Sequence, residues 1–261
     1  MTDVAADTIT VDLRDQIGTI TLDNPAQRNT LSVAMMQSIT STLREFGGSS
    51  EVGAVVIRAE GRAFSAGHDL REMLDRTLED ERHIFAVCTE LMETVQSIPQ
   101  PVIAAVQGPA LAAGCQLVAT CDLAIATETA VFGTPGVKIG LFCSTPMVAV
   151  SRAIGRKRAL QMLLTGQVID ARTAADWGLI NEVVVPERVD ERARELAAQV
   201  TTASPLTLKI GKQAFYRQID LPQADAYAEM REVMASNAMT CDAQEGMSAF
   251  LQKRPAVWQG R

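Results

Sequence analysis

The sequence predicts an α/β protein with a parallel sheet and a helical C-terminal region. Short apolar runs without alternation, typical of buried parallel strands, occur at 54–57, 102–106 and 123–126. Helical segments separate these runs, which is the order expected of an α/β fold. From 203 to 252 only helical patterns are found. We therefore expect an α/β core followed by helices.

The N-terminal elements follow from periodicity and from turn residues. Segments 8–13 and 17–22 alternate with period two, which predicts paired strands around a turn near Asp15 and Gln16. Segment 31–46 has apolar residues at helical spacing and predicts a helix that stops at Gly47 and Gly48.

The elements expected after residue 80 are mostly helices. A long helix is expected over about 80–98, and helices dominate after Pro146, interrupted by a strand at 180–185. Neither an internal repeat nor a low-complexity linker is found. We expect two parts, a core at 1–200 and a helical region at 201–261.

Composition excludes several classes of protein. The 261 residues carry 24 Lys and Arg against 31 Asp and Glu, a net charge of -7, which argues against a general nucleic-acid binder. No stretch reaches the roughly 18 uncharged apolar residues of a membrane helix. Five cysteines without a C-x-x-C pair and only two histidines argue against a disulfide framework and a metal site. The acidic segment 1–15 resembles no targeting peptide, so we expect a cytoplasmic protein.

Two glycine-containing turns follow predicted buried strands, at 62–70 and 107–117. Small residues let a ligand approach the backbone, and a helix start presents free N–H groups. Two such turns side by side can direct two N–H groups at one oxygen, which is an oxyanion hole. The alternative is that each is an ordinary turn between a strand and a helix.

The residues of these turns resemble a known family. The segment 64–70, FSAGHDL, matches the F-x-A-G-x-D-[LI] signature of the crotonase (enoyl-CoA hydratase/isomerase) superfamily. The resemblance covers essentially the whole chain, and its further matching segments are 101–108, 113–117, 121–122, 132–135, 164–166, 174–180 and 245–247.

The resemblance implies a ClpP/crotonase-like spiral of ββα units with a C-terminal helical trimerisation region, assembled as a homotrimer or as a hexamer of two trimers. It implies an acyl-CoA or enoyl-CoA ligand in fatty acid metabolism, with coenzyme A as part of the substrate and no permanently bound cofactor. The shared chemistry is stabilisation of a thioester enolate by two backbone N–H groups, which fall here on Ala66 and Ala113.

Two side chains depart from the hydratase pattern. Hydratases that resemble this chain carry one Glu where this sequence has Gln116 and another where it has Gly136. A glutamine cannot take a proton and a glycine has no side chain. Because losing a general acid–base group costs about 10²–10⁴ in rate, ordinary hydration is not expected. A subgroup of the superfamily shares both substitutions, and the chain resembles it at 112–117, 134–137, 140–146 and 250–254.

Several other residues are candidates to replace the two glutamates. His68 can reach the pocket or point to solvent. Cys143 fits best as a packing residue, and Ser144 stands where dienoyl-CoA isomerases of the family carry an Asp. Thr134 can hold a water, and Asp69 is expected to cap a helix. The acids of 72–81 predict a solvated helix face, with one acid turned inward as the alternative.

Binding of coenzyme A by an acidic protein requires local cations. The resemblance points to Arg28 and, from a neighbouring subunit, to Lys253 with Arg254. The matched segments add further substrate-binding candidates, namely Phe64, Ala66, His68, Asp69, Leu70, Ala112, Thr134, Phe142, Cys143 and Phe250.

Three functions remain open at this point. The first is an enzyme that uses the oxyanion hole, either as a weak hydratase with a water held by Gln116 or in another enolate reaction such as isomerisation or decarboxylation. The second is a non-catalytic acyl-CoA-binding protein. The third, a scaffold without ligand binding, is the least compatible with the two intact turns.

Overall fold

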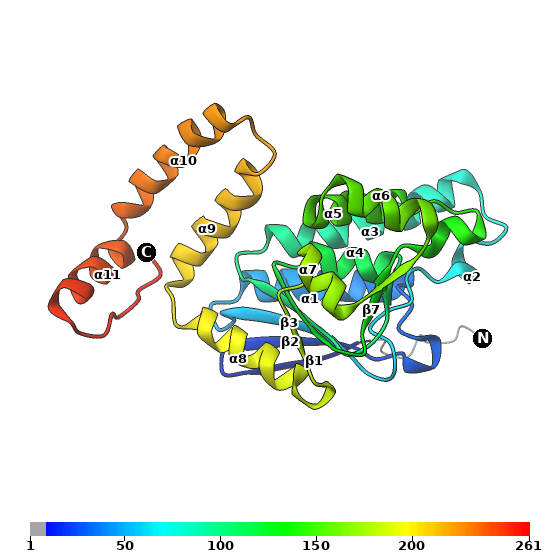
Figure 1. Ribbon diagram of the computed structural model, residues 1–261. Coiled ribbons are helices and arrows are strands. Elements are labelled where there is room, and N and C mark those ends of the chain that lie inside the picture. The colour runs from blue at the N-terminus through cyan, green and yellow to red at the C-terminus, as the bar shows by residue number, and fades with distance from the viewer. Residues whose placement is uncertain (1–8) are drawn as a thin grey trace.

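The computed structural model describes residues 9–261 (Figure 1). Thr8, the expected start of the first strand, lies outside the described residues, as does most of the acidic N-terminal segment. No helix among the described residues is long and apolar enough to cross a membrane.

The core is a six-stranded sheet with the order β1-β2-β3-β4-β6-β9. The hairpin of β1 and β2 is antiparallel, as the alternating segments predict, and every other pairing in this sheet is parallel. The strands are β1 (Ile9–Arg14), β2 (Ile17–Leu22), β3 (Ala54–Ala59), β4 (Val102–Val106), β6 (Leu123–Thr127) and β9 (Glu182–Val184).

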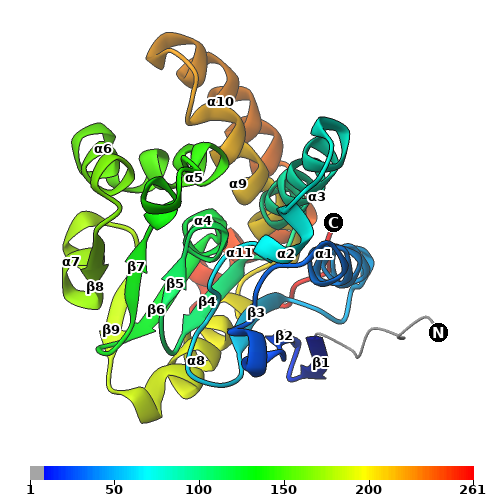
Figure 2. The ribbon, with the colours of Figure 1, turned by 90° about the vertical axis from the view of Figure 1, so that its right-hand side faces the viewer.

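The three apolar runs are unalternating because helices cover both faces of the sheet (Figure 2). On one face lie α1 (Val33–Gly48), α3 (Leu78–Ser97) and α4 (Ala113–Thr120), which pack around the larger cluster of buried side chains. On the other face lies α8 (Val189–Thr201), whose Val189, Ala193 and Ala197 pack against Val56 and Ile103. The helix expected over 31–46 corresponds to α1, which continues through Gly47 and Gly48 instead of stopping before them.

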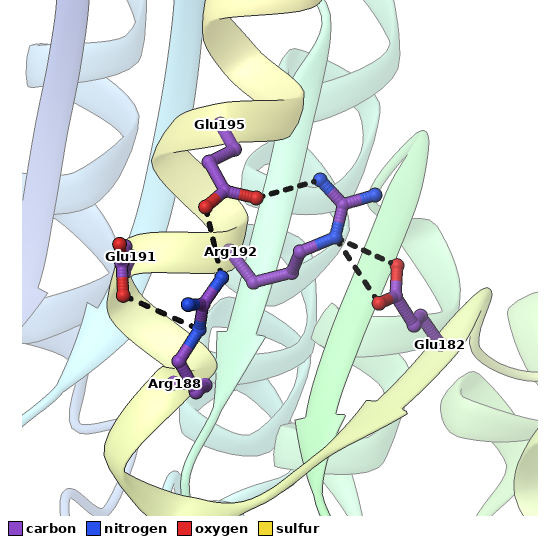
Figure 3. A network of polar contacts seen from close by, with 5 residues as sticks. All are labelled: Glu182, Arg188, Glu191, Arg192 and Glu195. Atoms are coloured by element: carbon purple, nitrogen blue, oxygen red, sulfur yellow. Dashed lines mark hydrogen bonds and ion pairs between the residues drawn. The ribbon is translucent and has the colours of Figure 1, made fainter.

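An ion-pair network fixes α8 on the sheet (Figure 3). Arg192 contacts Glu182 of β9 at 2.9 Å and Glu195 of its own helix at 3.2 Å. Arg188 contacts Glu191 and Glu195 one and two turns along the chain. On the β3 side, Arg58 pairs with Asp190 at 3.0 Å.

A second, three-stranded sheet is not predicted by the sequence. It consists of β5 (Ala110–Leu111), β7 (Val131–Gly133) and β8 (Val168–Asp170), with β7 parallel to β5 and antiparallel to β8. These strands are two or three residues long, too short for a periodicity to be recognised. The remaining elements of this part are η1 (Pro25–Gln27), α2 (Leu70–Met73), η2 (Pro135–Ile139), α5 (Ser144–Ile154), α6 (Arg156–Thr165), α7 (Ala171–Trp177) and η3 (Pro186–Arg188).

Three helices extend from the core at the C-terminal end, as Figure 1 shows. They are α9 (Pro205–Gln218), α10 (Gln223–Ala238) and α11 (Cys241–Gln252). Buried Lys212 of α9 attaches them to the core, because its Nζ lies 2.7 Å from Asp122 and donates to the carbonyls of Val95 and Gln100. The division of the chain into 1–200 and 201–261 stays a prediction.

Candidate functional site

A cavity of about 740 Å³ lies where the two predicted glycine-containing turns meet α2, η2 and α5. Much of its wall is apolar, with contributions from Phe85, Leu141 and Pro146. Ten of the residues that the sequence singles out line it, namely Ala66, His68, Asp69, Leu70, Ala112, Ala113, Gly136, Phe142, Cys143 and Ser144.

The two turns are in direct contact. The N–H of Leu111 donates to the carbonyl of Ser65 at 2.9 Å. A Cβ atom on Gly114 would lie only 2.5 Å from the same carbonyl oxygen and 2.7 Å from the Ser65 Cβ. Only a glycine permits this approach, which brings the end of one turn against the start of α4.

The first residue of α4, Ala113, offers a backbone donor to the cavity. Its N–H has no acceptor among residues 9–261, as expected for the first turn of a helix. The preceding Ala112 has φ 49° and ψ -117°, a conformation that is costly for a residue with a Cβ. Its own N–H donates to the Gly133 carbonyl at 2.9 Å, which fixes the turn.

The second donor is not the one that the resemblance implies. The N–H of Ala66 donates to the carbonyl of Arg28 at 3.0 Å, so it is occupied within the fold. The N–H of Gly67 donates to the Ser65 hydroxyl at 3.2 Å. The N–H of His68, in contrast, has no acceptor within the described chain. The expected donor Ala66 is thus engaged within the fold, and of the N–H groups of residues 66–68 only that of His68 has no acceptor among residues 9–261. No motif position could reveal this, because the difference lies in backbone hydrogen bonding.

The His68 side chain belongs to the cavity wall. Its ring lies edge-on to Phe85, with 5.5 Å between the centroids. Burial lowers the pKa of the imidazole, which is therefore neutral at neutral pH. Both ring nitrogens are buried, and the backbone of Leu31 opposes the effect of burial on the pKa of the imidazole. Of the two orientations that the sequence leaves open, the structure has the ring turned away from solvent.

Gln116 does not line the cavity. It lies on α4, is only 4% exposed, and its Oε1 is 3.8 Å from the Cys88 thiol of α3. Thr134 is likewise fully buried and outside the cavity wall. Its role in holding a water, like that of Gln116, stays a prediction.

Gly136 lines the cavity but has no room for a side chain. A Cβ atom there would lie 2.1 Å from the Leu141 carbonyl oxygen and 2.8 Å from the Cys143 sulfur. The N–H of Leu141 donates back to the Gly136 carbonyl at 3.0 Å, which closes this turn. Burial raises the pKa of the Cys143 thiol, so the thiol is protonated at neutral pH and is not a base.

The acidic residues near the cavity are engaged elsewhere. Asp69 caps α2 as expected, since its carboxylate accepts from the Arg71 N–H at 3.0 Å and from Arg71 Nε at 2.8 Å, and the hydrogen bond from the Arg71 side chain lowers its pKa. Glu72 accepts from the N–H of Val33 at the start of α1. None of the acids of 72–81 lines the cavity, so the inward-turned acid is not found.

The cavity has two cations in its wall that sequence reasoning missed, Arg71 and Lys138. Lys138 forms no ion pair with any described residue. The expected cation Arg28 is exposed and takes part in the site through its carbonyl. Three other candidates do not line the cavity of their own chain, the buried Phe64 and the exposed Phe250 and Lys253.

Comparison with known proteins gives a consistent result. The family described as Enoyl-CoA hydratase/isomerase matches residues 12–261. The mitochondrial enoyl-CoA hydratase domain-containing protein 3 of Rattus norvegicus is 43% identical over 246 residues, which are 94% of this chain and 82% of the relative.

Solved structures agree with this similarity. The human enoyl-CoA hydratase domain-containing protein 3 matches with a TM-score of 0.94 and 42% identity, covering 96% of this chain and 100% of that one. An enoyl-CoA hydratase of Mycobacterium smegmatis matches with a TM-score of 0.94 and 43% identity, covering 97% and 99%. The predicted fold class and the resemblance to this subgroup are confirmed.

One expectation is contradicted. Relatives from rat, mouse, human and Xenopus laevis are named mitochondrial. The cytoplasmic location expected from composition and from the acidic segment 1–15 is therefore wrong. Neither observation reports the location of a protein directly, which is why both misled.

Proposed function

Because this chain belongs to the enoyl-CoA hydratase/isomerase family, we propose that it binds acyl-CoA thioesters in the cavity between α2, η2 and α5. The backbone N–H groups of His68 and Ala113 polarise the thioester carbonyl. The single observation that carries this proposal is that both N–H groups belong to cavity-lining residues and have no acceptor within the described chain. Preorganised backbone donors of this kind stabilise the negative charge that develops on an enolate oxygen.

The phosphates of coenzyme A require cations at the cavity mouth. Arg71 and Lys138 are in the wall, and Arg28 is next to the turn that contains His68. A neighbouring copy of the chain adds Phe250 and Lys253 in this proposal. A homotrimer, or a hexamer of two trimers, is supported by exposed apolar side chains in the C-terminal helical region, namely Phe215, Tyr227, Met234, Met239, Phe250 and Leu251.

Hydration is not the reaction that this site supports. Gln116 lies outside the cavity wall, and Gly136 cannot accept a side chain without moving the Leu141 carbonyl. A second glutamate is therefore excluded by the backbone as well as by the sequence. The chemistry that remains is enolate stabilisation, as in isomerisation or decarboxylation, with acyl-CoA binding without turnover as the alternative.

Exchange of the α-hydrogens of butyryl-CoA in D₂O, followed by NMR, distinguishes enolate chemistry from binding without turnover. Stabilisation of the enolate accelerates exchange above the rate without protein, whereas a pure binding protein leaves the rate unchanged. In parallel, the loss of crotonyl-CoA absorbance measures hydration. Rapid hydration, at a rate usual for an enzyme of this type, would contradict the proposal.

A further inference from the structure

Ser65 lies between the two glycine-containing turns and is fully buried. Its N–H donates to the carbonyl of Pro109 at 3.2 Å, and its carbonyl accepts from the N–H of Leu111 at 2.9 Å. Its side-chain hydroxyl accepts from the N–H of Gly67 at 3.2 Å. The backbone of Ser65 thus joins the two turns, while its hydroxyl acts within the first of them.

The hydroxyl affects which N–H groups of the first turn are left for a ligand. The N–H of Ala66 donates to the Arg28 carbonyl, and that of His68 has no acceptor among the described residues. The N–H of Gly67, between them in the chain, is held by the Ser65 hydroxyl. Without the hydroxyl the buried Gly67 N–H would lose its acceptor, which is costly, so the backbone would gain by turning it toward another one.

Gly67 is a residue at which such a rotation can occur. Its φ is 98°, and a glycine can adopt further backbone conformations that a Cβ would forbid. The peptide group that follows it carries the His68 N–H, so a rotation at Gly67 changes the direction of that donor. A Cβ atom added at Gly67 would lie 3.3 Å from the backbone nitrogen of Ala113. Gly67 is therefore next to both N–H groups that have no acceptor, and its conformation sets the angle between them.

We propose that the Ser65 hydroxyl is a positioning group for this pair of N–H groups. This inference rests on the proposed function. By holding the Gly67 N–H, the hydroxyl keeps the His68 N–H directed at the same point of the cavity as the Ala113 N–H. Donors that are fixed before the ligand binds stabilise a developing negative charge most strongly. The motif F-x-A-G-x-D-[LI] leaves position 65 unspecified, so the resemblance to the family assigns Ser65 no role.

Calorimetric titration of the full-length protein with butyryl-CoA and with coenzyme A alone tests this role. Ser65→Ala should reduce the preference for the thioester over coenzyme A about 10-fold, the effect of one lost hydrogen bond. The affinity for coenzyme A itself should stay unchanged, because the cations that bind its phosphates are not altered. Ser65→Cys keeps a side chain of similar size with a weaker acceptor and should give an intermediate preference.

Ser49→Ala is the matched control. The Ser49 hydroxyl also accepts from the N–H two residues later, that of Glu51, at 3.1 Å, and Ser49 does not line the cavity. The same hydrogen bond is therefore removed at a distance from the site. We expect the thioester preference of this variant to equal that of the wild type.

Infrared difference spectroscopy reports the two donors directly. The C=O stretching band of butyryl-CoA, isotope-labelled at the carbonyl carbon, shifts to lower frequency when N–H groups polarise the bond. We expect a smaller shift in Ser65→Ala than in the wild type, and the wild-type shift in Ser49→Ala. A residue that only supports the fold would lower both affinities together and leave the band of the bound thioester where it is.

The outcomes separate this role from the proposed function. An unchanged preference and an unchanged band shift in a folded Ser65→Ala variant overturn the positioning role and leave the proposed function in place, as does an equal loss of affinity for both ligands. If circular dichroism shows that Ser65→Ala does not fold, Ser65→Cys decides by the same two measurements. A wild-type protein that binds butyryl-CoA no more tightly than coenzyme A overturns the proposed function, and the role of Ser65 with it.

Discussion

At the scale of single residues, Gly136 stands where the family resemblance implies a glutamate in hydratases. Its α-carbon faces the Leu141 carbonyl and the Cys143 sulfur so closely that even a methyl group has no space. The substitution is therefore more than a lost carboxylate, because the turn to Leu141 occupies the place of the side chain. Restoring a glutamate at 136 would have to rebuild this turn.

Replacing Gly136 by alanine should lower the free energy of unfolding by about 1–3 kcal/mol, the usual cost of overpacking. Gly211→Ala is the matched control, since no atom lies within 4 Å of its added Cβ and the position is inside α9. That variant should gain about 0.5–1 kcal/mol from the helix preference of alanine. Urea denaturation measures both, and equal stability of Gly136→Ala and wild type would show that the turn yields easily.

Sequence reasoning reached the site through its motifs but not through its hydrogen bonds. The motif at 64–70 located the turn. The Ala66 N–H, however, donates to the Arg28 carbonyl, whereas the His68 N–H has no acceptor among residues 9–261. Arg71 and Lys138 were missed because nothing in a helical or turn pattern tells which side chains border a cavity. Their only signal was positive charge near the two motifs.

At the scale of elements, the attachment of α9 to the core depends on one buried cluster. The Asp122 carboxylate contacts Lys212 at 2.7 Å and accepts from the Tyr216 hydroxyl and the Val102 N–H, both at 2.7 Å. Burial lowers the pKa of Lys212, while the charge of Asp122 opposes this change. The cluster joins α9 to β4, so it sets the direction in which the C-terminal helices leave the core.

Lys212→Met should destabilise the protein by about 3–5 kcal/mol, because it leaves the Asp122 carboxylate buried without a cation. Tyr216→Phe removes one hydrogen bond and should cost about 1–3 kcal/mol. Lys209→Met, at an exposed position one turn earlier in the same helix, is the control and should change little. Thermal unfolding at neutral pH ranks the three variants, and a Lys212→Met protein as stable as Lys209→Met would refute the role of the cluster.

The chain after α11 is held by Glu245, whose carboxylate accepts from Arg254 at 2.6 and 2.8 Å and from the Val257 N–H at 3.0 Å. The hydrogen bonds from Arg254 lower the pKa of Glu245 from its ordinary 4.5 to about 2. Since the folded state favours the ionised form, the resulting stabilisation is complete above pH 4.5 and is lost as the pH falls toward about 2.

Acid titration of stability tests this contact. Glu245→Gln should flatten the loss of stability between pH 4.5 and about 2 relative to wild type. Glu187→Gln, at an exposed glutamate in η3, is the control and should leave the acid dependence as it is. Identical acid curves for wild type and Glu245→Gln would rule out the contribution.

At the scale of the whole molecule, the sequence predicted the layered core far better than the surroundings of the cavity. The runs in β3, β4 and β6 are readable because both faces of these strands are buried, which selects apolar residues at every position. The strands β5, β7 and β8 are defined by tertiary pairing alone. The cavity is built from such short segments, and its residues were therefore found through motifs and not through periodicity.

The molecule as a whole has two cavity-lining residues, His68 and Ala113, whose backbone N–H groups have no acceptor among residues 9–261. We propose that acyl-CoA binding does not need the two glutamates, because backbone groups of His68 and Ala113, and not side chains, hold the thioester. Side-chain substitutions at Gln116 and Gly136 leave such donors in place.

Titration calorimetry with butyryl-CoA, with coenzyme A alone as the reference, tests this claim most directly. We expect saturable binding of one thioester per chain, tighter than that of coenzyme A because the carbonyl adds its hydrogen bonds to those of the phosphates. Equal affinity for the thioester and for coenzyme A, or no binding of either, would contradict it.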